Sequence, residues 1–122
     1  MKYFIPLLLA LMVPTKLIFA HPPSNIMLEF DPFEYTLMIT IPHSVNDPGK
    51  HYVYKIIVEL NGKEIIKQEF KAQWSEDEQV AIYQLPDAQH GDEVSVTAYC
   101  NISGKKKGTI QIILEEVLEP DE

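Results

Sequence analysis

One cysteine and three histidines have the residue types and the spacing that metal chemistry requires. Cys100 is the single cysteine of the chain, and His21, His43 and His51 precede it. A thiolate together with several imidazoles is a donor set for transition metals. A lone thiol also has no disulfide partner within its own chain. The sequence therefore predicts a transition-metal site at which one sulfur and three ring nitrogens meet.

Residues 1–20 have the pattern of a secretory signal. Lys2 gives a basic start, an apolar stretch runs over 4–13, and Ala20 is a small residue at the expected cleavage position. The apolar stretch is too short to span a bilayer comfortably. We therefore expect an exported protein, periplasmic or extracellular, with no stable membrane insertion after cleavage. Its mature chain would begin at His21, whose α-amino group and imidazole form a chelating pair.

The remaining residues, 21–122, are strongly acidic and long enough for one domain with a modest core. The full chain has 18 acidic residues, ten lysines and no arginine. Without Lys2 and Lys16, eight lysines face these 18 carboxylates, a net charge of −10. Nucleic acid is therefore excluded as a partner. Residues 114–122 carry five carboxylates and are expected to form an acidic tail.

Short runs rich in Ile, Val, Tyr, Thr and Phe alternate with turn residues along the chain, which predicts strands. Asn61-Gly62 lies between two such runs and predicts a two-residue hairpin turn with positive φ at both positions. Prolines between the runs forbid long helices. The pattern predicts an all-β, immunoglobulin-like β-sandwich of about seven strands. The expected strands are 26–30, 35–41, 52–60, 63–70, 79–84, 93–100 and 108–114.

The expected strands place three of the candidate ligands at sheet ends. His43 and His51 flank one strand-connecting loop, and Cys100 ends a strand. His90 begins the turn before that same strand, so an extended chain puts it roughly 30 Å from Cys100 and excludes it from the site. Taken singly, these residues have simpler explanations. A lone cysteine at a strand end is usually a small buried hydrophobe, and a histidine in a polar loop is usually solvated.

Three segments around these residues form an ordered pattern. Residues 42–59 read Pro-His-Ser-Val-Asn-Asp-Pro-Gly-Lys-His-Tyr-Val-Tyr-Lys-Ile-Ile-Val-Glu, residues 98–104 read Ala-Tyr-Cys-Asn-Ile-Ser-Gly, and residues 21–23 read His-Pro-Pro. The pattern resembles the iron-binding domain of the desulfoferrodoxin/neelaredoxin (superoxide reductase) family. That family shows an early His-x-Pro, a His-Pro-Met-like segment, a short loop, Lys-His-Tyr-Ile and then Tyr-Cys-Asn-x-His-Gly. The resemblance spans nearly all of 21–122.

The resemblance implies a mononuclear non-haem iron with four histidine nitrogens in a plane, a cysteine sulfur below and the sixth position open. Superoxide would bind there, take one electron and, with two protons, leave as hydrogen peroxide. Another small anion is the alternative partner. Matched residue by residue, the metal ligands are His21, His43, His51 and Cys100, while Ser103 occupies the position of the fourth histidine. The resemblance assigns Lys50 the role of attracting the anion. The family's additional cysteine-ligated iron domain is absent, so an external electron-donor protein is implied.

Two other functions fit the same residues. An N-terminal His21 can chelate copper through both of its nitrogens, which suggests a periplasmic copper-binding module, and three histidines with one thiolate also suit tetrahedral zinc. A metal-free relative that acts as a structural domain is the third hypothesis. Lys105–Lys107 is interpreted either as a local positive patch or as a solvated turn.

Overall fold

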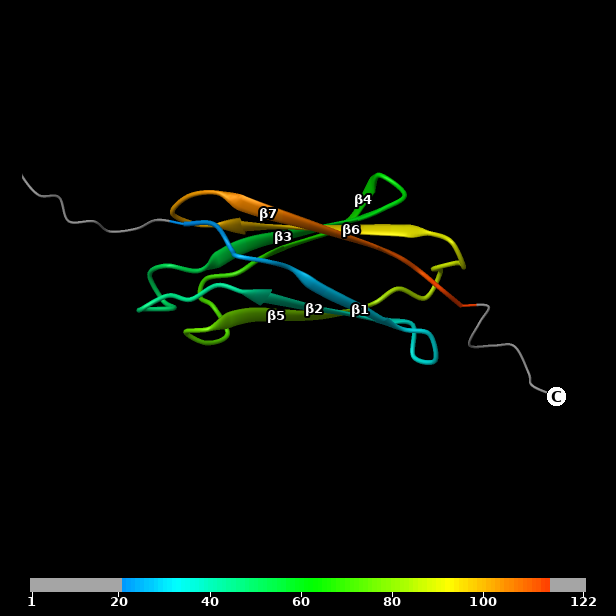
Figure 1. Cartoon of the computed structure of the whole chain (residues 1–122), viewed down its shortest axis with the longest axis horizontal. Helices are drawn as coiled ribbons and strands as arrows, with labels where there is room; N and C mark the ends of the chain where they lie inside the picture. The colour runs from blue at the N-terminus through cyan, green and yellow to red at the C-terminus, as the bar shows by residue number, and fades with distance from the viewer. Residues whose placement is uncertain (1–20, 115–122) are drawn as a thin grey trace, which may run out of the picture.

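The computed structural model describes residues 21–114, which form two packed antiparallel sheets (Figure 1). The expected signal segment, 1–20, and residues 115–122 of the acidic tail lie outside the described residues. One sheet has the order β1-β2-β5 and the other β4-β3-β6-β7. The strands are β1 Met27–Asp31, β2 Thr36–Pro42, β3 Val53–Leu60, β4 Lys63–Glu69, β5 Glu78–Gln84, β6 Glu93–Cys100 and β7 Lys105–Gln111. The all-β sandwich of seven strands is confirmed.

Within 21–114 there is no helix with the length and apolar character needed to cross a membrane.

The core lies between the sheets because apolar residues alternate along the central strands. In β2, Leu37, Ile39 and Ile41 are fully buried, and the residues between them face outward. In β6 of the opposite sheet, Val94 and Val96 are also fully buried and face the core. Alternation with a period of two places one face of each strand in the core and the other in water. The core therefore follows directly from the pattern of the strands.

A register shift in β3 lies next to the predicted site. Val53 pairs with Cys100, whereas Lys55 pairs with Tyr99, so the ladder slips at residue 54. Such a bulge re-aims the side chains around it. Val53 and Ile56 are both fully buried as a result, although a regular strand would place them on opposite faces. The irregularity sits where β3 leaves the loop that carries His51.

The predicted hairpin turn is confirmed. Asn61 has φ 52° and Gly62 has φ 84°, and they connect the antiparallel strands β3 and β4.

The last strand begins earlier than the sequence predicted. It starts at Lys105, not at residue 108, and Lys105, Lys106 and Lys107 pair with Tyr99, Ala98 and Thr97. The lysine run is therefore not a solvated turn. An edge strand accepts lysines because their backbone joins the ladder while their long side chains reach water.

The segment before β1 packs against the turn between β6 and β7. Gly104 has φ 85°, and a Cβ at this position would lie 2.7 Å from Cβ of Pro22. The amide of Ser24 donates to the backbone oxygen of Pro42 at 3.1 Å, which ties the same segment to the end of β2. Residue 21 is thus held at the end of the sandwich where β2 and β6 end and β3 begins.

Replacing Gly104 with Ala is expected to release residues 21–24 from this end. The new methyl group collides with Pro22, and positive φ adds about 1–2 kcal/mol of strain. Gly91→Ala is the matched control, because Gly91 has φ 92° and open space around it. Amide hydrogen exchange should show faster exchange at Ser24 in Gly104→Ala and unchanged exchange there in Gly91→Ala. Equal protection of Ser24 in both variants would contradict the packing argument.

Candidate metal centre

Three histidines from separate segments meet at one end of the sandwich. His21 comes from the segment before β1, His43 directly follows β2, and His51 lies in the loop before β3. Their potential ligand atoms all lie within 4.8 Å of one another. The ring centroids are 4.9 Å apart for His21 and His43, 5.0 Å for His21 and His51, and 4.8 Å for His43 and His51. The rings therefore form a nearly equilateral triangle, which we call the imidazole triad.

The surroundings of His51 favour its neutral form. Burial, helped by the nearby rings of His43 and His21, lowers the pKa of His51 from its ordinary value of 6.5, and a backbone hydrogen bond to His21 opposes the shift only partly. Among the described residues, His51 Nε2 is the buried side-chain nitrogen without a hydrogen-bond partner. A buried unsatisfied polar atom is costly, and a metal ion is one partner that satisfies it. Neutral imidazole is also the form that binds metals.

His43 has its ring orientation and tautomer set by Gln73. The amide nitrogen of Gln73 donates to the backbone oxygens of His43 at 2.7 Å and Ser75 at 3.0 Å. Its Oε1 must then be the acceptor, and it receives the Val53 amide at 3.1 Å and His43 Nδ1 at 2.8 Å. With the proton on Nδ1, the lone pair of a neutral His43 lies on Nε2. Metal-binding histidines are commonly oriented in this way, by a hydrogen bond from the ring nitrogen that does not bind the metal.

His43 Nε2 requires a proton or a cation close to it. The atom lies 3.1 Å from the backbone oxygen of His21. A lone pair on Nε2 facing a carbonyl oxygen is unfavourable unless a proton or a cation lies beside them. His21 Nδ1 lies 3.1 Å from the oxygen of Pro22, so it donates there and leaves its own Nε2 as an acceptor. The three rings thus present basic nitrogens to one small volume.

Cys100 lies at the same end but outside the imidazole triad. It is 5% exposed and sits opposite Val53, two residues beyond His51. Its Sγ accepts the amide of Ile102 at 3.4 Å and does not belong to the group of atoms within 4.8 Å. The structure therefore brings together His21, His43 and His51, while a metal–sulfur bond from Cys100 stays a prediction.

Asn101 ties the His51 loop to the Cys100 turn. Its side-chain oxygen accepts the Tyr52 amide at 2.8 Å, and its side-chain nitrogen donates to the backbone oxygen of Lys50 at 3.0 Å. These two bonds bracket His51 on both sides. The loop is further closed by the amides of Lys50 and His51, which both donate to the oxygen of Asp47 at 2.9 Å.

The remaining predicted residues lie around this end or far from it. Lys50 is exposed beside His51, and Ser103 is exposed in the turn after Cys100. His90 lies at the other end of β6, where its Nδ1 accepts the amide of Leu114 at 2.9 Å. The exclusion of His90 from the cluster agrees with the structure. The anion-attracting role of Lys50 stays a prediction.

Sequence reasoning did not identify Gln73 or the structural role of Asn101. A glutamine in an Ala-Gln-Trp loop carries no recognisable signal, because its value depends on contacts with His43, thirty positions away, and with Val53. The importance of Asn101 could have been predicted, because it belongs to the Tyr-Cys-Asn segment that resembles the family's pattern.

No protein-family model matches the sequence, and no curated protein matches it. Among solved structures, superoxide reductase (1Fe-SOR) from Giardia intestinalis superposes with TM-score 0.58 at 17% identity, covering 75% of this chain and all of that one. Superoxide reductase (neelaredoxin) from Ignicoccus hospitalis gives TM-score 0.55 at 13% identity, with coverage of 76% and 82%.

This chain has the superoxide reductase fold. The fold implied by the residue resemblance is therefore confirmed, and so is a histidine cluster that can bind a metal at one end of it.

Replacing Gln73 with Met tests its hold on His43. Met is similar in length but leaves the His43 ring and the Val53 amide without their acceptor. We expect the free energy of unfolding to fall by about 1–3 kcal/mol and the affinity for Zn²⁺ to fall about 10–100-fold. Val94→Ala is a control that loses core packing at the far end of β6. Chemical unfolding and competitive zinc titration should show both variants destabilised and only Gln73→Met weakened in zinc binding.

Acid should destabilise the metal-free protein through His51. Because the pKa of His51 in the folded chain lies below 6.5, the unfolded chain takes up that proton more readily. The stabilisation is complete above pH 6.5 and is lost as the pH falls through the lower folded-state pKa. Urea unfolding across this range should show stability decreasing with falling pH, with a smaller decrease in His51→Gln. An unchanged slope in that variant would contradict the prediction.

Proposed function

We propose that this chain is an exported protein of the superoxide reductase type, in which the imidazole triad holds a mononuclear non-haem iron and superoxide is reduced to hydrogen peroxide. The observation that carries the proposal is the imidazole triad itself. The three histidines were matched to the family from the sequence. Their ligand atoms lie within 4.8 Å of one another at one end of a superoxide reductase fold. Cys100, matched to the family's axial sulfur, lies at the same end.

The donor set fits iron. Imidazole nitrogen binds iron, copper and zinc, and a thiolate favours the same group over magnesium or calcium. The three ring-centroid distances, 4.8 to 5.0 Å, differ little. Three corners of a square would leave one pair of rings clearly farther apart, so the triad is grouped on one side rather than spread in a plane. Such a grouping would hold a metal ion from one side, and Cys100, at the same end of the sandwich, would be the sulfur donor.

The residues of the chain have distinct roles in this proposal. The triad binds in its neutral form, which the lowered pKa of His51 favours. Gln73 and Asn101 keep His43 and His51 in place. Lys50 brings a positive charge next to His51 in a chain that is otherwise acidic, and thereby attracts the superoxide anion. Cys100 would supply the sulfur ligand of a bound iron, which tunes the chemistry of the metal. Iron, when bound, supplies the one-electron chemistry.

The electron comes from outside the chain. Reduction of one superoxide consumes one electron and two protons and yields one hydrogen peroxide. A second cysteine-ligated iron site requires several cysteines, and the sequence has one. The proposal therefore includes an external one-electron donor protein.

The test uses protein purified from cells that express the full chain, loaded anaerobically with Fe²⁺. We expect one hydrogen peroxide per superoxide in the presence of a reductant, whereas dismutation would give half as much and release oxygen. His51→Ala should lose iron uptake and activity, and His90→Ala, the matched histidine outside the triad, should keep both. Loading with Zn²⁺ or Cu²⁺ separates the alternatives.

The outcomes distinguish the metal site, the reductase activity and the copper-binding alternative. Failure to take up iron would overturn the metal site. Iron uptake without superoxide consumption would leave the site and overturn the reductase. Strong copper binding that is lost when the α-amino group of His21 is blocked would favour the copper-binding module instead.

A further inference from the structure

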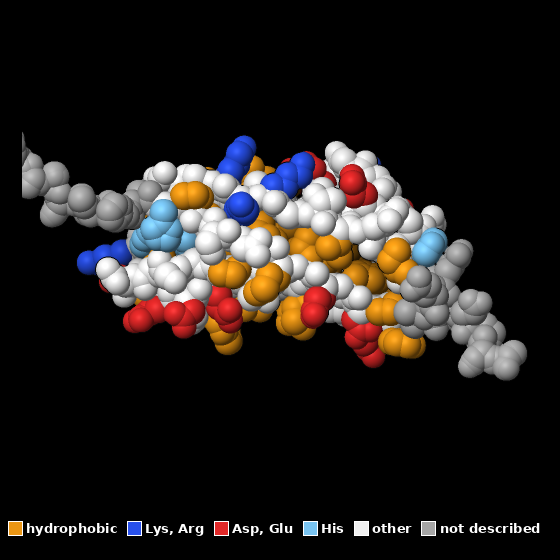
Figure 2. Space-filling view, in the orientation of Figure 1, with side chains coloured by type: hydrophobic (Ala, Val, Ile, Leu, Met, Phe, Trp, Pro, Cys, Tyr) orange, Lys and Arg blue, Asp and Glu red, His pale blue; other side chains and the backbone are white. Residues whose placement is uncertain are grey.

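Positive charge is confined to one sheet of the sandwich. Within 21–114, all eight lysines lie in 50–71 and 105–107, the segments that form β3, β4, β7 and their flanking turns. The segments 22–48 and 72–91, which build the β1-β2-β5 sheet and its loops, contain no lysine and eight acidic residues. Figure 2 shows most of the visible lysines along the upper side and at the end with the histidines, and most of the visible acidic side chains along the lower side. The remaining described segments carry five acidic residues against these eight lysines, so one side of the molecule is acidic and the other has an excess of positive charge.

Four of the lysines form two neighbouring rows on the outer face of the β4-β3-β6-β7 sheet. Ile56, Val96 and Ala98 are fully buried and face the core, so the residues adjacent to them in β3 and β6 face outward. Cross-strand pairing then aligns the outward residues. The first row is Glu69, Lys55, Tyr99 and Lys105, and the second is Lys67, Ile57, Thr97 and Lys107. We call these eight residues the lysine face.

The centre of the lysine face is organised around Tyr99. The ammonium of Lys55 lies 4.3 Å from the centroid of the Tyr99 ring, and that of Lys105 lies 5.6 Å from it. Cation–π contacts of this kind hold the lysine head groups over the ring. Glu69 is the single acidic residue in the two rows, so the face has a net positive charge in a chain of net negative charge.

The lysine face adjoins a hollow that reaches Cys100. The hollow has a volume of ≈ 370 Å³ and is lined by Tyr52, Tyr54, Glu69, Phe70, Cys100 and Asn101. Glu69 belongs to both the hollow and the first row, so the two features are continuous. A molecule seated on the lysine face therefore lies beside the hollow, which Cys100 also lines.

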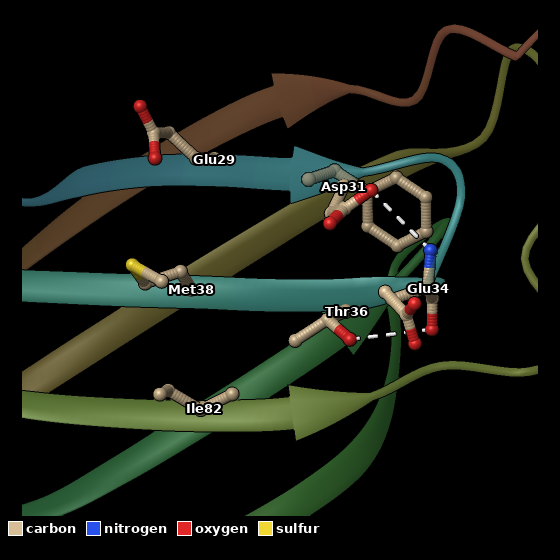
Figure 3. Close-up of a pocket in the computed structure, with 7 residues that line it drawn as sticks. Glu29, Asp31, Glu34, Thr36, Met38 and Ile82 are labelled. Atoms are coloured by element: carbon tan, nitrogen blue, oxygen red, sulfur yellow. Dashed lines mark hydrogen bonds between the residues drawn. The ribbon is translucent and has the colours of Figure 1, made fainter.

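The opposite side of the sandwich is unsuited to an anionic partner. A hollow of ≈ 570 Å³ on the β1-β2-β5 sheet is lined by Glu29, Asp31 and Glu34 together with Phe30, Thr36, Met38 and Ile82 (Figure 3). Figure 3 shows Glu29 and Asp31 along β1 and Glu34 in the turn that follows it. They repel anions, so an acidic molecule that approaches the protein is turned toward the lysine face.

We propose that the lysine face binds a small acidic protein that delivers one electron to the metal centre past Cys100. The inference rests on the proposed function, which requires an external donor. A compact acidic protein can touch the four lysines alone, whereas a membrane surface or a long polyanion would also meet the acidic rest of the chain. Charge complementarity of this kind raises the rate of encounter and sets orientation. In each turnover the donor is oxidised by one electron, and one superoxide with two protons becomes hydrogen peroxide.

The test compares two double variants with the same change of charge. Lys105→Glu with Lys107→Glu reverses two charges of the lysine face. Lys63→Glu with Lys106→Glu is the control, because Lys63 lies at the β3–β4 turn and Lys106 alternates to the other side of β7. The donor probe is a reduced acidic plant-type ferredoxin, and ascorbate is the small-molecule reductant. Reduction of the oxidised iron-loaded protein is followed by stopped-flow absorbance at low salt.

We expect ferredoxin to reduce the Lys105/Lys107 variant roughly tenfold more slowly than the wild type, with the control variant nearly unaffected and ascorbate rates equal in all three proteins. Added salt should slow the wild type most. Equal ferredoxin rates in both variants would overturn the lysine face as the docking site, while ascorbate-supported superoxide reduction would leave the proposed function intact.

Binding can also be measured without iron. Titration of the metal-free protein with ferredoxin, followed by amide NMR shifts, should perturb β6 and β7 near Tyr99 even if the iron site fails. Shifts confined to the β1-β2-β5 sheet would contradict the proposal. Co-sedimentation with phosphatidylglycerol vesicles that depends on Lys105 and Lys107, without a ferredoxin effect, would assign the face to a membrane surface and overturn the proposal.

Discussion

The side-chain amide of Gln73 joins the two sheets at the end where the histidines meet. It contacts His43, which follows β2 in one sheet, and Val53, which begins β3 in the other. All four of its hydrogen bonds go to groups that would otherwise need partners inside the protein. Because a buried amide with satisfied partners tolerates little displacement, the distance between the two sheet ends is set here. The relative positions of His43 and the loop with His51 depend on that distance.

The triad is assembled around Gln73 by contacts that are individually small. Pro22 against Gly104 holds the His21 segment, and Asn101 brackets His51 through its neighbours. Each contact comes from a different turn, so the basic nitrogens converge only when the turns are folded together. Burial lowers the pKa of His51, and its neutral imidazole is the form that binds a cation. The orphaned Nε2 of His51 is the clearest expression of this.

Electrostatics divides the molecule in the same way as the topology does. The two sheets are formed by alternating stretches of the chain. Within 21–114, the lysines occur only in the stretches that form β3, β4, β7 and their flanking turns. The metal end lies where both sheets meet, with the lysine face on one side and the acidic residues Glu76, Asp77 and Glu78, at the start of β5, on the other. A negatively charged protein can in this way present a positive surface close to a site that is proposed to act on an anion.

The alternation of apolar residues, the Asn61-Gly62 turn and the order of the histidines were sufficient to predict the sandwich and its histidine-bearing end, because strand periodicity and turn chemistry are local properties. The start of β7 at Lys105 was not predicted, since edge pairing overrides the composition of a lysine run. Local sequence likewise does not reveal Gln73, whose role requires partners brought close by both sheets, nor the lysine rows, which exist only through cross-strand register. The position of Cys100 outside the imidazole triad was also decided by packing. The sequence predicts which strand ends lie at the same end of the sandwich, but it does not predict which single atoms come close enough to share a metal.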